Sequence, residues 1–91
     1  MMHADEGGTR LSSLLERVPV GWTRVTFEGR PYGLSRVDRV GARVVTVTAE
    51  ELGGPDFLSA NIYRTTAADL LRSCEIPDAK VLAFLRGWSL D

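Results

Sequence analysis

The chain has few side chains that could do chemistry, and its only cysteine, Cys74, is the one candidate nucleophile. It lies in Arg72-Ser73-Cys74-Glu75, where the arginine favours the reactive thiolate and the glutamate opposes it. A lone cysteine is more often a small buried hydrophobic residue. Because there is no second cysteine, an intrachain disulfide is excluded and redox turnover would need an external thiol.

A second group with chemical potential is the acidic, glycine-rich segment 50–56. It carries three carboxylates: Glu50, Glu51 and Asp56. Paired carboxylates can transfer protons or hold a hard cation. Their spacing matches no calcium-loop pattern, and the Gly-Gly-Pro run between them lacks the Lys-Ser/Thr of a phosphate-binding loop. We therefore interpret the segment as a solvated loop that is better suited to contacting a partner than to catalysis.

The remaining residues predict no catalytic triad, metal site or cofactor. A triad needs a base, and the only histidine, His3, lies in the acidic segment 1–8, which we expect to be a disordered tail. One cysteine and one terminal histidine do not supply a metal site. No GxGxxG dinucleotide fingerprint occurs. These absences favour a non-enzymatic protein that needs no cofactor.

The elements that would position these residues begin and end with a helix. Residues 9–17 and 77–87 each place apolar side chains at i, i+3, i+4 and i+7, which predicts one apolar stripe per helix. The stripes are Leu11, Leu14, Leu15 and Val18 in the first helix, and Val81, Phe84, Leu85 and Trp88 in the second.

Four strands are predicted between the helices, over residues 22–27, 32–37, 43–49 and 57–64. The segment 43–49 is the richest in β-branched residues on both faces, so we expect it to be a central strand that is partly covered on both sides. Gly33 and Ser35 interrupt the segment 32–37 and predict a weaker strand. Residues 66–75 could form a helix or a hairpin loop with a fifth strand from residue 70, and the nearby Pro77 favours the hairpin.

Together these elements predict an α+β fold: an antiparallel β-meander of four or five strands with an N-terminal and a C-terminal helix packed on it. Residues 9–91 would form a single domain, and an SH3-like barrel with helical ends is the structural alternative. No apolar run reaches transmembrane length and residues 1–8 lack a signal-peptide core, so we expect a cytoplasmic protein with no membrane contact. An exposed sheet edge would allow a homodimer.

The predicted contact surface is the polar face of this sheet together with the acidic loop. Its candidate residues are Trp22, Arg24, Tyr32, Glu50, Glu51, Asp56, Asn61 and Tyr63. Trp22 falls opposite Val25 and Phe27 and is expected to be exposed, whereas Trp88 is expected in the core.

Basic residues on the first strands suggest what such a face could bind. Residues 24–43 contain five arginines against two acidic residues, a local net charge of +3 that could bind RNA or an acidic protein. The whole chain has a net charge of −1, so a protein partner is favoured over RNA.

Several motifs resemble a family of small, largely uncharacterised actinobacterial proteins, some of which are labelled peptide methionine sulfoxide reductase. They include Gly21-Trp22-Thr23-Arg24, Ala49-Glu50-Glu51-Leu52-Gly53-Gly54-Pro55-Asp56, Ser59-Ala60-Asn61-Ile62-Tyr63-Arg64-Thr65 and Leu71-Arg72-Ser73-Cys74-Glu75-Ile76-Pro77. The resemblance covers most of residues 18–88 and implies an alternative function, thiol-dependent redox chemistry at Cys74.

The motif around Cys74 departs from both classes of that reductase. The first class has Gly-Cys-Phe-Trp, whereas this chain has Ser73-Cys74-Glu75-Ile76. In the second class only Arg72 and Cys74 fit, and the zinc-binding cysteine pairs are missing. The resemblance therefore supports the family more than the enzymatic activity.

Overall fold

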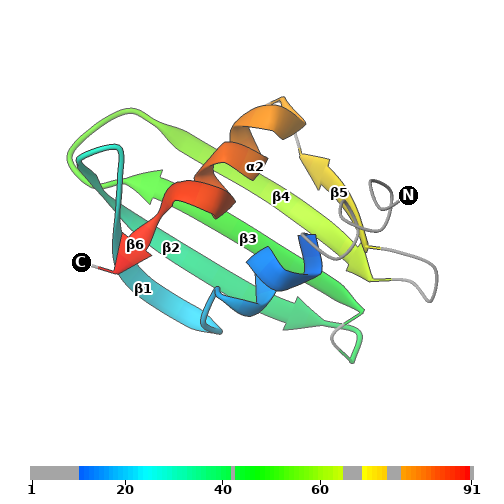
Figure 1. Cartoon of the computed structure of the whole chain (residues 1–91). Helices are drawn as coiled ribbons and strands as arrows, with labels where there is room; N and C mark the ends of the chain where they lie inside the picture. The colour runs from blue at the N-terminus through cyan, green and yellow to red at the C-terminus, as the bar shows by residue number, and fades with distance from the viewer. Residues whose placement is uncertain (1–10, 42, 65–68, 74–76, 91) are drawn as a thin grey trace.

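The computed structural model describes residues 11–41, 43–64, 69–73 and 77–90. Within them, six strands form one antiparallel sheet in the order β5-β4-β3-β2-β1-β6 (Figure 1). The strands are β1 (Gly21–Phe27), β2 (Arg30–Arg39), β3 (Val44–Glu51), β4 (Phe57–Arg64), β5 (Asp69–Ser73) and β6 (Ser89–Leu90). The first five follow one another as a meander, and β6 returns to pair with the outer edge of β1.

The predicted α+β class and the antiparallel meander are confirmed. The fifth strand, favoured over a helix for residues 66–75, is β5, while Cys74 and the segment 65–68 lie outside the described residues. The short β6 was not predicted. The sheet ends in two different edge strands rather than closing on itself, so the SH3-like barrel was the wrong alternative.

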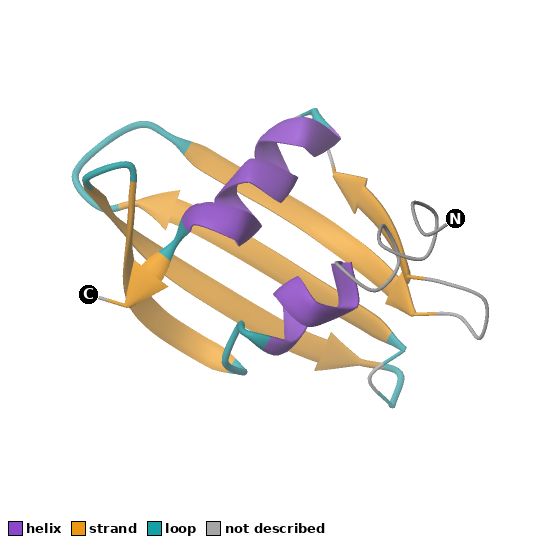
Figure 2. Cartoon of the chain, viewed as in Figure 1, coloured by secondary structure: helices purple, strands orange, loops and turns teal. Residues whose placement is uncertain are grey.

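Two helices lie on the same face of the sheet (Figure 2). The first covers residues 11–16, and the second is α2 (Asp78–Gly87). All eight residues of the two predicted stripes are buried, including Trp88. They pack on the inward side chains of the strands: Val25, Leu34, Val45, Val47, Ala49, Leu58, Ala60 and Ile62. Residues 1–8, predicted to be a tail, lie outside the described residues.

Two arginines hold these helices in place. Arg36 of β2 donates to the backbone oxygens of Leu15 and Val18 at 2.8 and 3.0 Å. Arg17 donates to the oxygens of Leu85 and Trp88 at 3.3 and 3.1 Å, and its guanidinium lies 4.8 Å from the Trp88 ring centroid. Because the last carbonyls of a helix have no partner within it, these contacts satisfy both helix C-termini and connect them to the rest of the fold.

The central strands differ in two respects from the prediction. β3 is central, but within the described part of the chain helices cover only one of its faces, and Val44, Thr46 and Thr48 are half-buried on the other. β2, expected to be weak, is the longest strand at 10 residues. Gly33 does not interrupt it, because the Trp22 indole of β1 packs where a side chain at that position would lie.

The turns set the strand register. Glu28 and Gly29, with φ of 53° and 77°, form the two-residue hairpin turn that brings Phe27 opposite Arg30. The predicted acidic loop is shorter than expected, because Glu50 and Glu51 continue β3 and pair with Gly33 and Tyr32.

Candidate functional site

The sheet surface opposite the helices is a candidate site, and we call it the open face. Side chains alternate between the two sides of a strand, so the outward residues follow directly from the buried ones. They are Trp22, Arg24 and Thr26 of β1, Pro31, Gly33, Ser35, Val37 and Arg39 of β2, Val44, Thr46, Thr48 and Glu50 of β3, Phe57, Ser59, Asn61 and Tyr63 of β4, Leu70 and Arg72 of β5, and Ser89 of β6. No described element packs over this surface.

Large hydrophobic side chains gather on the open face. Five of the eight that the described residues expose lie here: Trp22 (62% exposed), Val37 (50%), Phe57 (51%), Tyr63 (40%) and Leu70 (48%). They surround smaller polar side chains, because the register places Ser35, Thr48 and Ser59 in one row across the strands. In the next row the Thr46 hydroxyl donates to Oδ1 of Asn61 at 2.8 Å.

Trp22 is the most exposed aromatic residue on the open face, and its position is fixed by Gly33. A Cβ atom added to Gly33 would lie 2.6 Å from the indole Nε1, so the ring rests directly on the glycine backbone. With 62% of the residue still accessible, the structure presents a flat aromatic surface without leaving the ring free to rotate.

The arginines of residues 24–43 do not form one basic face, which corrects the sequence interpretation. Arg24 and Arg39 are on the open face. Arg30 and Arg36 lie on the helix side, because side chains alternate along β2 and these two share the side of the buried Leu34. The described side chains of the open face include three arginines, Arg24, Arg39 and Arg72, and one acidic residue, Glu50, which gives them a net charge of +2.

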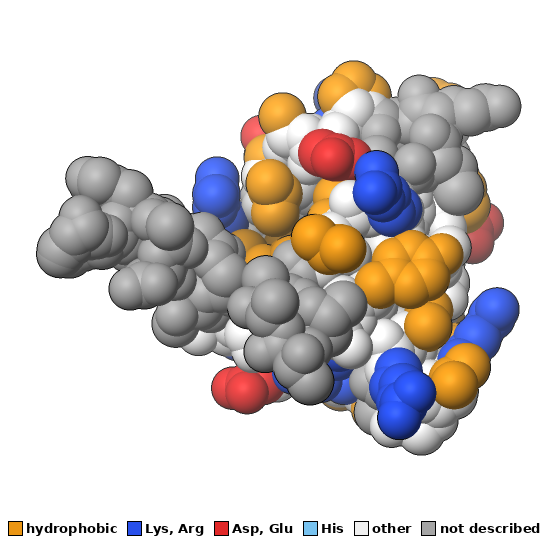
Figure 3. Space-filling model, turned by 90° about the vertical axis from the view of Figure 1, so that its right-hand side faces the viewer, with side chains coloured by type: hydrophobic (Ala, Val, Ile, Leu, Met, Phe, Trp, Pro, Cys, Tyr) orange, Lys and Arg blue, Asp and Glu red, His pale blue; other side chains and the backbone are white. Residues whose placement is uncertain are grey.

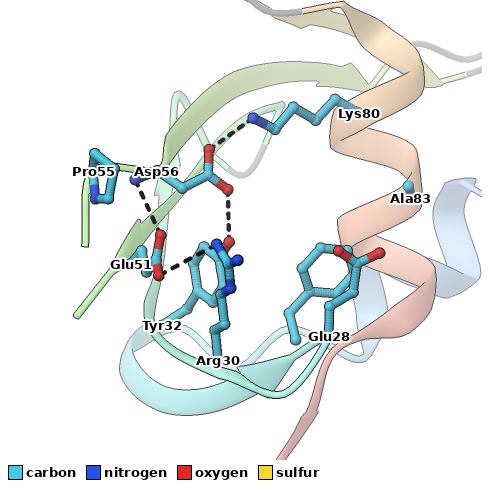
Figure 4. A pocket seen from close by; sticks show the side chains of 9 residues that line it. Glu28, Arg30, Tyr32, Glu51, Pro55, Asp56, Lys80 and Ala83 are labelled. Carbon is cyan, nitrogen blue, oxygen red and sulfur yellow. Dashed lines mark hydrogen bonds and ion pairs between the residues drawn. The ribbon is translucent and has the colours of Figure 1, made fainter. Parts of the chain in front are cut away.

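A second polar group lies on the helix side, in a pocket between β2, the β3–β4 loop and α2 (Figure 4). The pocket has a volume of about 590 Å³. At its centre the Tyr32 hydroxyl donates to Oδ2 of Asp56 at 2.6 Å, and Nζ of Lys80 donates to Oδ1 at 2.7 Å. Glu51 accepts the backbone N–H of Asp56 at 3.2 Å and lies 3.7 Å from Arg30.

The electrostatics of this group stabilise the protonation states that Asp56 and Tyr32 already have at neutral pH. Hydrogen bonds from Lys80 and Tyr32 hold the pKa of Asp56 below its usual value. Burial, with the hydrogen bond to Asp56, raises the pKa of Tyr32 to about 12. A general acid or base works best with a pKa near the working pH, so neither residue is suited to proton transfer. The group instead fastens the β3–β4 loop to α2.

The eight predicted binding residues therefore divide into two separate sets. Trp22, Arg24, Glu50, Asn61 and Tyr63 share the open face. The other three, Tyr32, Glu51 and Asp56, belong to the pocket on the helix side, and Tyr32 is only 2% exposed. The prediction treated Tyr32 as a contact residue, but its ring packs against Phe84 with centroids 5.1 Å apart.

Several residues of these sites were not predicted. Val37, Phe57 and Leu70 complete the hydrophobic part of the open face, and strict alternation along each strand would have identified the first two. Lys80 pairs with Asp56 across 24 residues of sequence, a contact that no local pattern indicates.

The described residues were compared with the requirements of a metal site and of a membrane-spanning helix. Among them, no group of three or more His, Cys, Asp or Glu side chains could hold a metal ion, and no helix is long and apolar enough to cross a membrane. Comparison of the chain with protein-family models, curated proteins and solved structures found no match. The resemblance to the actinobacterial family and the redox role of Cys74 thus remain predictions from the sequence.

Proposed function

We propose that this chain is a small cytoplasmic, non-enzymatic binding module that docks a protein partner on the open face. The observation that carries the proposal is the presence of five large exposed hydrophobic side chains on one sheet surface that no described element covers, two of which, Tyr63 and Leu70, are directly paired. Exposed hydrophobic residues scattered singly are normal, but a concentration of them on one face is typical of an interaction site.

The geometry of the face suits protein recognition. Strands in a sheet lie about 4.8 Å apart, so the face spans roughly 19 Å from β1 to β5, wide enough for a helix or a strand pair of the partner. Because Gly33 already fixes the Trp22 ring, little side-chain entropy would be lost when it is buried. Aromatic anchors of this kind dominate the binding energy of many interfaces.

Affinity capture with matched variants tests the proposal. The face variant carries Phe57→Thr and Leu70→Thr, which remove hydrophobic area while keeping β-branched side chains suited to strands. The control variant carries Val20→Thr and Leu90→Thr. These residues are 68% and 69% exposed but lie outside the open face, and Leu90 pairs with the core residue Val25.

Each immobilised protein would be incubated with a lysate of the organism that encodes the chain, and the retained proteins quantified by mass spectrometry. We expect a partner that wild type and the control variant retain and the face variant loses. Equal retention by the two variants would contradict the proposal, provided that both have the circular dichroism spectrum of the wild type.

A further inference from the structure

We infer that the partner presents an acidic, partly apolar segment to one end of the open face, an inference that rests on the proposed function. The segment would lie across the end where β2 and β4 finish and β3 and β5 begin. We call this region the basic end, and it consists of Val37, Arg39, Val44, Tyr63, Leu70 and Arg72.

The strand register assembles the basic end. Arg39 is opposite Val44, which is opposite Tyr63, which is opposite Leu70, so these four side chains form one row across four strands. The adjacent row begins with Val37 and ends with Arg72. Two arginines thus lie at opposite sides of a hydrophobic strip, and Figure 3, which views the molecule from this end, shows basic side chains beside exposed hydrophobic ones.

The charge of the open face is unevenly distributed along the strands. Glu50, the one acidic residue among the described side chains of the face, lies in the row of Arg24, with Gly33 between them. These two opposite charges lie in a different part of the face from Arg39 and Arg72. The basic end therefore carries the net charge of +2, which attracts carboxylates, and its hydrophobic strip favours apolar side chains between them.

Two other occupants fit the face less well. A second copy of the chain, packed face to face, would bring two surfaces of net charge +2 together, which opposes association. RNA-binding domains are usually basic overall, whereas this chain has a net charge of −1. Within the basic end, Tyr63 is the one side chain with a flat ring on which an unpaired base could stack, and Val37, Val44 and Leu70 are aliphatic.

Selection from a random peptide library displayed on phage tests the inference with a defined probe. The immobilised target is the full chain, and selected peptides are synthesised and their dissociation constants measured. We expect enrichment of peptides in which Asp or Glu flanks aliphatic or aromatic residues. Arg39→Gln with Arg72→Gln should weaken their binding about three- to tenfold, the range for two exposed ion pairs. Arg86→Gln, which removes an exposed arginine of α2 on the helix side, should leave binding unchanged.

The outcomes distinguish a failure of the docking face from a failure of the acidic partner alone. If selected peptides bind the Phe57→Thr, Leu70→Thr variant as tightly as wild type, or if no peptide is enriched, both the docking face and the acidic partner are refuted. Peptides that need the open face but are neutral or basic, or that ignore the Arg39 and Arg72 substitutions, would refute the acidic partner alone. Two other results would also refute the acidic partner. One is tighter binding of a fluorescent oligouridine than of any selected peptide. The other is dimerisation of the free chain that becomes stronger with Arg39→Gln and Arg72→Gln.

Discussion

Replacing Tyr32 by phenylalanine tests whether the polar group on the helix side is a structural fastening. The substitution removes one hydroxyl, which donates to the Asp56 carboxylate at 2.6 Å, and leaves the buried ring in place. Hydrogen bonds to charged groups contribute about 1.5–3 kcal/mol. Asp56 keeps its 2.7 Å bond to Lys80 and its side chain is 25% exposed, so we expect the lower limit, about 1.5 kcal/mol.

The pH dependence of this loss follows from the two perturbed groups. The pKa of Tyr32 is raised from 10.0 to about 12. Its contribution to the free energy of unfolding is therefore complete below pH 10. That contribution is lost as the pH rises towards 12, because the unfolded chain releases the tyrosine proton first. The pKa of Asp56 is lowered, so its contribution is present above its usual value of 3.8 and is lost as the pH falls through the folded-state pKa. The stability difference between wild type and Tyr32→Phe should thus be largest between these limits and shrink in both acid and alkali.

Urea unfolding monitored by circular dichroism at several pH values measures this difference. Tyr63→Phe is the matched control, since Tyr63 is the only other tyrosine and is 40% exposed on the open face. In thermal unfolding at pH 7, the melting temperature of Tyr32→Phe should be about 6–12 °C below that of the wild type, the shift expected for 1.5 kcal/mol in a domain of this size. Equal stability of the two variants at pH 7, or a difference that grows above pH 10, would refute the role assigned to Tyr32.

Three further substitutions test other parts of the fold. Glu28→Asn should raise stability by about 0.5–1 kcal/mol in thermal unfolding, because asparagine tolerates the positive φ that Glu28 adopts before Gly29, and no gain would contradict the assigned turn. Gly33→Ala should displace the Trp22 ring and lower stability by roughly 1–3 kcal/mol. In a Trp88→Phe background it should also change the fluorescence spectrum of Trp22, and an unchanged spectrum would contradict the packing of Trp22 on Gly33. Arg36→Met should cost about 1–3 kcal/mol in urea unfolding, because the Val18 oxygen loses the Arg36 donor and the Leu15 oxygen keeps only the N–H of Val18. A neutral effect would contradict the role assigned to Arg36.

Much of this fold could be predicted from local patterns in the sequence. The i, i+3, i+4, i+7 spacing identified eight buried residues within or just after the two helices, and period-two alternation identified the inward side chains of β3 and β4. The short turns between strands predicted the antiparallel meander. These features depend on neighbouring residues, which is why one sequence is enough to find them.

What could not be predicted depends on contacts between distant segments. Gly33 looked like an interruption of β2 because the sequence does not show that Trp22 packs on it. Tyr32 looked like a contact residue because the sequence does not show that its ring packs against Phe84 and its hydroxyl donates to Asp56. The predicted site mixed residues from both sides of the sheet because no strand register was known.

The docking role of the open face can be measured most directly by site-specific photocrosslinking in living cells. A photoreactive phenylalanine analogue would replace Phe57, which is 51% exposed on the open face, or Leu90, which is 69% exposed on the helix side. We predict a protein adduct from position 57 that is absent from position 90 and is lost when Leu70→Thr is added. Equal adducts from both positions, or an adduct from position 90 alone, would contradict the claim that the open face is where this protein binds its partner.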